Sequence, residues 1–144
     1  MQNQFSNFEI KPTIMRSYPH RILVIEDEPS WQAIISHCLR RTKLEEVSLR
    51  FVRTSKQALD LIHSERRFDL IICDHYIDGS MTGYELWEKC SNLYLNIPFI
   101  FVSGKKKSDF LRFQSEGSPK LPIVIEKPFE PHIFTAAVNL YLNR

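Results

Sequence analysis

The sequence predicts an α/β fold in which a parallel sheet is covered by helices on both faces. Short apolar runs of strand length alternate five times with segments of helical periodicity. No internal repeat interrupts this alternation, and polar residues follow the ends of the apolar runs. Alternating strand and helix patterns of this kind are typical of parallel sheets with crossover helices.

Length and composition favour one globular domain. The chain has 144 residues, of which 43% are hydrophobic and 25% charged, with a net charge of +2. A domain of this size buries roughly two-thirds of its unfolded surface and needs no disulfide or metal to fold. The basic residues are scattered, so direct contact with nucleic acid is not expected.

Cysteine usage and hydropathy indicate a cytoplasmic protein. Cys38, Cys73 and Cys90 form no CxxC pair, and an odd number cannot all pair internally, so reduced thiols fit best. No apolar stretch approaches the roughly 20 residues of a membrane span. The first ten residues lack the features of a secretory signal. We therefore expect a soluble protein with no membrane partner.

Residues 1–20 differ from the rest of the chain, because they are rich in Gln and Asn and show no sustained period. We expect a flexible arm that precedes a single domain over residues 21–144. The arm also carries the apolar residues Phe5, Phe8, Ile10 and Ile14. Docking of the arm on the domain or on a partner therefore stays open as a second interpretation.

The regular pattern begins with a strand and a helix. Residues 22–25 form an apolar run that ends in acids, as expected for a strand buried on both faces. Pro29 then opens a helix at a first-turn position that proline tolerates. One apolar stripe with helical spacing follows, made of Trp31, Ile34, Ile35, Cys38 and Leu39.

The next three elements continue the alternation. Residues 47–52 alternate apolar and polar side chains, which predicts a strand that can lie at a sheet edge. Thr54 or Ser55 can cap a second helix, whose inner side carries Ala58, Leu59 and Ile62. Residues 70–73 form a third strand that leads directly into Asp74.

The second half predicts two further strands and three helices. In chain order they are a helix over 84–95 with Leu86, Trp87 and Cys90 inward, a strand over 97–102, a short helix over 108–115, a strand over 121–125 and a helix over 131–142. Proline is accepted near a strand start, so Pro98 does not exclude the fourth strand. Phe110 and Phe113 fit either the core or an exposed docking surface.

The polar residues gather at one repeated place, the carboxyl ends of the first, third, fourth and fifth predicted strands. The residues in these positions are Glu26, Asp27, Asp74, Ser103 and Lys127. In open parallel sheets, ligands bind at the carboxyl ends of the strands, near the point where strand order reverses. We therefore expect three carboxylates, a hydroxyl and an ammonium group at one edge of the sheet.

This set of groups suits phosphoryl transfer. Converging carboxylates repel one another, and an oxygen-only ligand set favours Mg²⁺ as the neutralising ion. A lysine and a hydroxyl beside the metal supply donors to phosphoryl oxygens, and phosphoryl transfer depends mainly on positioning and charge neutralisation. A carboxylate can also be the nucleophile, forming an aspartyl-phosphate.

Four segments in order resemble the signatures of response-regulator receiver domains. They are residues 22–29 (ILVIEDEP), 69–74 (DLIICD), 98–104 (PFIFVSG) and 126–129 (EKPF). The resemblance covers residues 21–142. It implies a flavodoxin-like, doubly wound sheet of five parallel strands in the order 2-1-3-4-5, with five helices.

The resemblance also implies a role for each site residue. Asp74 matches the phosphoacceptor, Asp27 a direct Mg²⁺ ligand, and Glu26 a ligand that acts through water. Tyr76 matches the position whose backbone carbonyl binds the metal. Ser103 matches the hydroxyl residue that turns toward the phosphoryl group, and Lys127 the lysine that pairs with it. A cis Lys127–Pro128 bond is expected as well.

The implied function is two-component signalling. A histidine kinase or phosphotransfer protein donates the phosphoryl group to Asp74, and the modified domain controls protein–protein contacts. The family implies no metabolic enzyme, because a receiver catalyses only its own phosphorylation and dephosphorylation. No residues remain after the fifth helix for an output domain, so we expect the protein to act through contacts.

Two other functions are possible. A receiver-like scaffold would bind partners without phosphorylation. A phosphatase with an aspartyl nucleophile usually has a second Asp two residues after the first, where this chain has Tyr76, and the sequence disfavours it.

The sequence departs from the family pattern in two places. The family usually has proline four positions and glycine eight positions after the phosphoacceptor, whereas here Asp78 is fourth and Gly83 ninth. The loop is therefore expected to be one residue longer. Asp78 either adds a carboxylate to the site or is a solvated turn acid. Three positions before the lysine, Val124 replaces the usual aromatic residue, so we expect the fourth-helix and fifth-strand face to respond unusually or not at all.

Overall fold

The computed structural model describes residues 18–42, 44, 46–65, 67–93 and 96–142. Its elements are β1 (His20–Ile25), α1 (Pro29–Arg40), β2 (Val47–Val52), α2 (Ser55–Glu65), β3 (Leu70–Cys73), α3 (Gly83–Asn92), β4 (Phe99–Ser103), α4 (Lys107–Leu111), β5 (Ile123–Glu126) and α5 (Pro131–Leu142). All strand pairs are parallel, and the sheet order is β2-β1-β3-β4-β5. The predicted fold class and strand order are confirmed.

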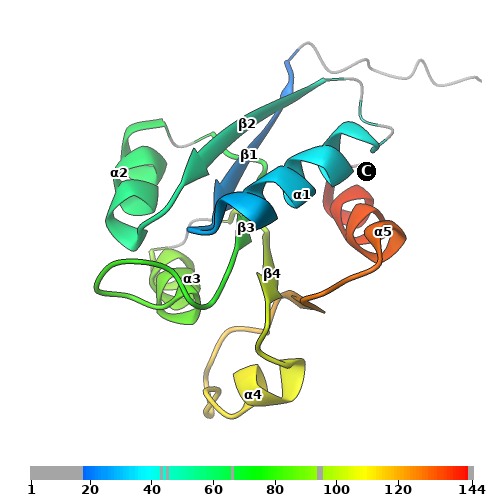
Figure 1. Ribbon diagram of the computed structural model, residues 1–144. Coiled ribbons are helices and arrows are strands. Elements are labelled where there is room, and N and C mark those ends of the chain that lie inside the picture. The colour runs from blue at the N-terminus through cyan, green and yellow to red at the C-terminus, as the bar shows by residue number, and fades with distance from the viewer. Residues whose placement is uncertain (1–17, 43, 45, 66, 94–95, 143–144) are drawn as a thin grey trace, which may run out of the picture.

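Helices cover both faces of the twisted sheet (Figure 1). On one face α1 and α5 pack over a core that includes Ile35, Leu39 and Phe134. On the other face α2, α3 and Phe110 of α4 pack over a second core, which includes Ile62 and Trp87. The strands β1, β3 and β4 lie between these two cores, which explains why their sequences are apolar throughout.

Strand β2 lies at one edge of the sheet, as its alternating sequence predicts. It pairs with β1 over its whole length, from His20 opposite Val47 to Ile25 opposite Val52. Its residues are mostly half-buried or exposed, whereas those of β3 and β4 are all buried. The sequence contrast between these strands therefore follows from their places in the sheet.

Proline or a side-chain cap marks the start of each of the first three helices. Pro29 occupies the first turn of α1, as predicted. Of the two candidate caps for α2, Thr54 is the one that caps, because its hydroxyl oxygen accepts the backbone N–H of Gln57 at 3.1 Å. Helix α3 begins at Gly83, one residue earlier than predicted, because Thr82 and Glu85 form a capping box.

Several predicted bounds were wrong by a few residues. Strands β4 and β5 begin directly after Pro98 and Pro122 rather than at residues 97 and 121, since proline lacks the N–H that a ladder requires. Helix α3 ends at Asn92 rather than at residue 95, and α4 ends at Leu111 rather than at residue 115. Ile34, assigned to the buried stripe of α1, is 42% exposed.

Three further findings concern the cysteines, the length of the helices and the N-terminal residues. The three cysteines are free thiols and are buried. No helix among the described residues is long and apolar enough to cross a membrane. Residues 1–17, which make up most of the expected flexible arm, lie outside the described residues.

Gly83 brings the start of α3 into close contact with the end of β3. Its N–H donates to the carbonyl of His75 at 2.8 Å. A Cβ atom at this position would lie 2.0 Å from the carbonyl oxygen of Asp74 and 3.0 Å from Sγ of Cys73. The space belongs to backbone, so a side chain cannot be accommodated by rotating a neighbour. The loop therefore needs glycine here, one position later than the family pattern.

We predict that Gly83→Ala destabilises the domain by roughly 1–3 kcal/mol or more, because the clash forces backbone shifts in a packed region. Urea unfolding of both proteins measures this difference. Gly104→Ala is the matched control, because no atom lies within 4 Å of its added Cβ. Equal destabilisation by the two substitutions would contradict the prediction.

Candidate functional site

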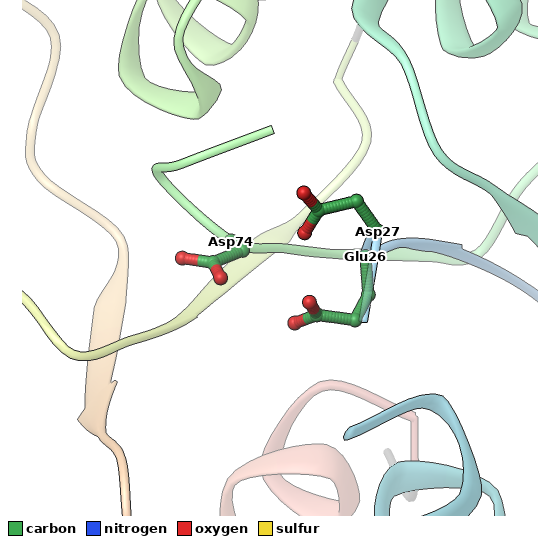
Figure 2. A group of neighbouring side chains, drawn as sticks. All are labelled: Glu26, Asp27 and Asp74. Carbon is green, nitrogen blue, oxygen red and sulfur yellow. The ribbon is translucent and has the colours of Figure 1, made fainter. Parts of the chain in front are cut away.

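Three carboxylates converge at the carboxyl edge of the sheet. Glu26 and Asp27 follow β1, and Asp74 follows β3, which pairs directly with β1. One oxygen from each lies within 4.8 Å of the other two. Figure 2 shows the three side chains projecting to the same side of the strand ends. The predicted convergence of these acids is therefore observed.

Lys127 lies between two of these carboxylates. Its Nζ donates to Glu26 Oε2 at 2.6 Å and to Asp74 Oδ2 at 2.8 Å. The side chain of Lys127 is 8% exposed and that of Glu26 is 1% exposed, so these are buried ion pairs. Main-chain contacts fix the lysine, since its N–H donates to the carbonyl of Ser103 at 2.8 Å, and the expected cis Lys127–Pro128 bond is present.

Burial and charge pull the titration of this pair in opposite directions. Burial raises the pKa of the Glu26 carboxyl above its ordinary value, although the hydrogen bond from Lys127 opposes this shift. Burial by itself lowers the pKa of Lys127. Its hydrogen bonds to Asp74 and Glu26 more than offset that effect, so the lysine pKa is raised. The ammonium group therefore stays charged and holds the buried acids together.

The hydroxyl of Ser103 is fully buried at the end of β4. Its Oγ accepts the backbone N–H of Lys105 at 3.2 Å, in a turn that follows the strand. Its O–H is a separate donor, because a hydroxyl can donate and accept at once. Ser103 therefore has a donor for a neighbouring anion while it holds the first turn of the β4–α4 loop.

The backbone of Tyr76 lies next to the carboxylate of Asp74. Its N–H donates to Asp74 Oδ1 at 3.3 Å, while its side chain is 60% exposed. Asp78 does not join the acidic group among the described residues. It is exposed, and its carbonyl accepts the N–H of Ser55 at 3.1 Å. The placement of Asp78 agrees with a solvated turn acid.

The donor set fits a divalent cation. Three carboxylates and one ammonium group leave a net negative charge in a confined place, and the ligand atoms are all oxygens. Carboxylate oxygens with room for water are the ligands that Mg²⁺ prefers. Glu26, Asp27 and Asp74 are thus the residues that would hold the ion.

Trp31 contributes to the site in a way that the sequence did not reveal. The Nζ atom of Lys127 lies 4.8 Å from the centroid of the Trp31 ring, and Trp31 also contacts Phe129 at 5.6 Å between centroids. The face of an aromatic ring attracts a cation. In the sequence Trp31 is one member of an apolar stripe. Its place in the first turn of the helix above Asp27 was the available signal.

His75 is a second residue whose surroundings were not predicted. It lies in the loop after β3 and is buried among aromatic rings. It stacks on Phe113 at 5.4 Å and meets Phe110 edge-on at 5.3 Å. The open question about these two phenylalanines has a divided answer, since Phe110 is fully buried and Phe113 is 44% exposed.

With the fold and site in view, comparison with known sequences defines the class of protein. Residues 22–139 match the family described as the Response regulator receiver domain. This match spans most of the chain, and the chain belongs to that family. The protein is therefore a receiver domain of two-component signalling, a signalling domain rather than a metabolic enzyme.

The chain is similar to response regulators from a plant and from a bacterium. The chain is 32% identical over 116 residues to the two-component response regulator ORR5 of Oryza sativa subsp. japonica, covering 78% of this chain and 81% of that protein. It is 27% identical over 124 residues to the response regulator SaeR of Staphylococcus epidermidis, covering 85% of this chain and 50% of that protein. The chain thus spans half the length of the latter.

Solved structures show the same fold. A CheY-like response regulator receiver domain protein from Methanospirillum hungatei superposes with a TM-score of 0.71 at 23% identity, covering 88% of this chain and 95% of that one. A response regulator receiver protein from Sinorhizobium medicae has a TM-score of 0.71 at 21% identity, covering 87% and 95%. At this level of identity the likeness concerns the fold.

We predict that Lys127→Met destabilises the metal-free domain at pH 8 by roughly 3–5 kcal/mol, because two buried acids lose their partner. Mg²⁺ should then stabilise the variant more than the parent, since the ion supplies the missing positive charge. Urea unfolding in a chelator and in excess Mg²⁺ measures both effects. Lys120→Met, at an exposed lysine, is the control. A variant as stable as the parent without metal would refute this account of the ion pairs.

Proposed function

We propose that Asp74 accepts a phosphoryl group in a Mg²⁺-dependent reaction, and that the modified domain controls protein–protein contacts. The donor is a histidine kinase or a phosphotransfer protein in the cytoplasm. The observation that carries this proposal is the convergence of Glu26, Asp27 and Asp74, with Lys127 bonded directly to Asp74. The family match supports the same conclusion for the class of signalling.

The proposed reaction transfers the phosphoryl group from a phosphohistidine nitrogen to a carboxylate oxygen of Asp74. The new P–O bond forms as the P–N bond breaks, and the imidazole nitrogen of the donor takes the electron pair. Bound Mg²⁺ supplies neutralising charge for the phosphoryl oxygens. Asp27 would hold the ion directly, Glu26 through water, and Tyr76 through its backbone carbonyl.

Lys127 and Ser103 have the remaining roles in this proposal. Before the reaction, Lys127 Nζ donates a hydrogen bond to Asp74 Oδ2. The same ammonium group is therefore placed to donate to a phosphoryl oxygen instead. Ser103 donates its O–H to another of these oxygens. Both donors come from the ends of neighbouring strands, β4 and β5. The added group carries roughly −1.5 to −2 charge, which is enough to favour a different arrangement of the surrounding loops.

We predict that incubation with acetyl phosphate and Mg²⁺ adds one phosphoryl group to the parent chain, and that Asp74→Ala abolishes the addition. Intact-mass spectrometry reports both results. Asp78→Asn is the matched control, because Asp78 is an exposed acid in the following loop. The control should be modified to the same extent as the parent, and a chelator should prevent modification of both.

Failure of the parent to take up a phosphoryl group, from acetyl phosphate and from a phosphorylated histidine phosphotransfer protein, would overturn this proposal. The chain would then fit a receiver-like scaffold that binds partners without phosphorylation. For such a scaffold, Asp74→Ala leaves the affinity for its partner unchanged, which a pull-down followed by titration would measure. Val124 in the usual aromatic position is the observation that favours this second candidate.

A further inference from the structure

Strand β5 has no aromatic side chain with which to report the state of Ser103. Its sequence is Ile-Val-Ile-Glu, and Val124 is a partly buried residue packed against the core. Valine is short and restricted at χ1, so it cannot swing between two positions as a ring can. Aromatic rings instead lie close together in the segment that follows Ser103 and at the start of the β3–α3 loop.

The first contact on that side joins Ser103 to Lys105. The backbone N–H of Lys105 donates to Ser103 Oγ at 3.2 Å. When Ser103 rotates to donate its O–H to a phosphoryl oxygen, its Oγ atom moves. The N–H of Lys105 then either follows the oxygen or loses its partner. In both cases the hydrogen bonding of the Lys105 backbone depends on the state of Ser103.

The side chain of Lys105 bridges two rings. Its Nζ lies 5.5 Å from the ring centroid of Tyr76 and 5.4 Å from that of Phe113. These separations are within the range of cation–π attraction. Tyr76 is two residues beyond Asp74, and Phe113 follows α4. Lys105 therefore connects the loop after the phosphoacceptor to the C-terminal side of α4.

The ring of His75 provides a second connection to the same phenylalanine. His75 directly follows Asp74, is 5% exposed and stacks on Phe113 with an interplanar angle of 16°. Phe110 meets His75 edge-on and stacks on Phe101 of β4 at 4.8 Å. Among the described residues, Nδ1 of His75 has no hydrogen-bond partner. Near Nδ1, the ring of His75 is held by contacts with other aromatic rings. Such contacts allow it to shift relative to Phe113.

We propose that in this chain the state of Asp74 is transmitted to α4 by two routes, through Ser103 and Lys105 and through the stack of His75 on Phe113, rather than through β5. This inference rests on the proposed phosphorylation of Asp74. Phe113 and Leu111 are 44% and 49% exposed. A shift of Phe113 therefore changes the exposed apolar surface at the C-terminal end of α4, which a partner would contact.

The test uses beryllofluoride with Mg²⁺ as the phosphoryl mimic and backbone amide chemical shifts as the readout. In the parent, we expect shift changes at residues 25–27 and 74 and also at residues 107–113. In Phe113→Leu and in Lys105→Met, the changes at the strand ends should remain. Those at residues 107–113 should fall by roughly twofold or more. Leu111→Ala is the control, since Leu111 is an exposed apolar residue of α4 that should leave the remaining changes intact.

Three results would overturn the inference. They are changes over residues 107–113 in both variants equal to those of the parent, a parent that responds at the strand ends but not at α4, and a loss of response at the strand ends in the variants. None of these affects the proposed function, which is measured separately by mass. A parent that neither binds beryllofluoride nor takes up a phosphoryl group would instead refute the proposed function, and the inference with it.

Discussion

The ion pairs of Lys127 with Glu26 and Asp74 are the interaction on which the rest of the site depends. Charges with so little exposure are unfavourable unless they are paired and hydrogen-bonded. The two carboxylates follow β1 and β3, and the lysine follows β5, on the far side of β4. The charge balance therefore requires that four strands end at the same level. A misplaced strand would leave a buried charge without its partner.

The same interaction bears on the proposed phosphorylation of Asp74. Lys127 Nζ donates a hydrogen bond to Asp74 Oδ2. A group that becomes bonded to this oxygen must therefore provide the lysine with another hydrogen-bond acceptor. A phosphoryl group does so, because its oxygens accept hydrogen bonds as strongly as a carboxylate does. The lysine has a flexible stem, and the ring of Trp31 lies against its ammonium group. A small movement of the Lys127 side chain can therefore transfer its hydrogen bond from Asp74 to a phosphoryl oxygen. During this movement the ammonium group stays against the face of the Trp31 ring, which attracts a cation.

The fold and the acidic group were predictable because both depend on residues whose position along a strand fixes their position in space. A carboxylate that follows a buried parallel strand must lie at the carboxyl edge of the sheet. Helical stripes are less informative, because periodicity gives a face and not the neighbour of each residue. Ile34 shares the stripe of α1 but is exposed, while Trp31 in the same stripe lies over Lys127. The surroundings of His75 depend on a loop whose path has no periodic signal, so they could not be predicted.

Position 124 separates two properties that the family usually combines. Glu26, Asp27 and Lys127 come from strand ends and lie together with Asp74. Position 124 of β5, opposite Phe101 of β4, instead holds a partly buried valine that packs against the core. Phe110, for which the sequence left core or exposed surface open, is fully buried against Phe101 and His75. In the proposed function, acceptance of a phosphoryl group depends on the strand ends and its effect on a surface depends on the loops that leave them, so the two properties can change independently.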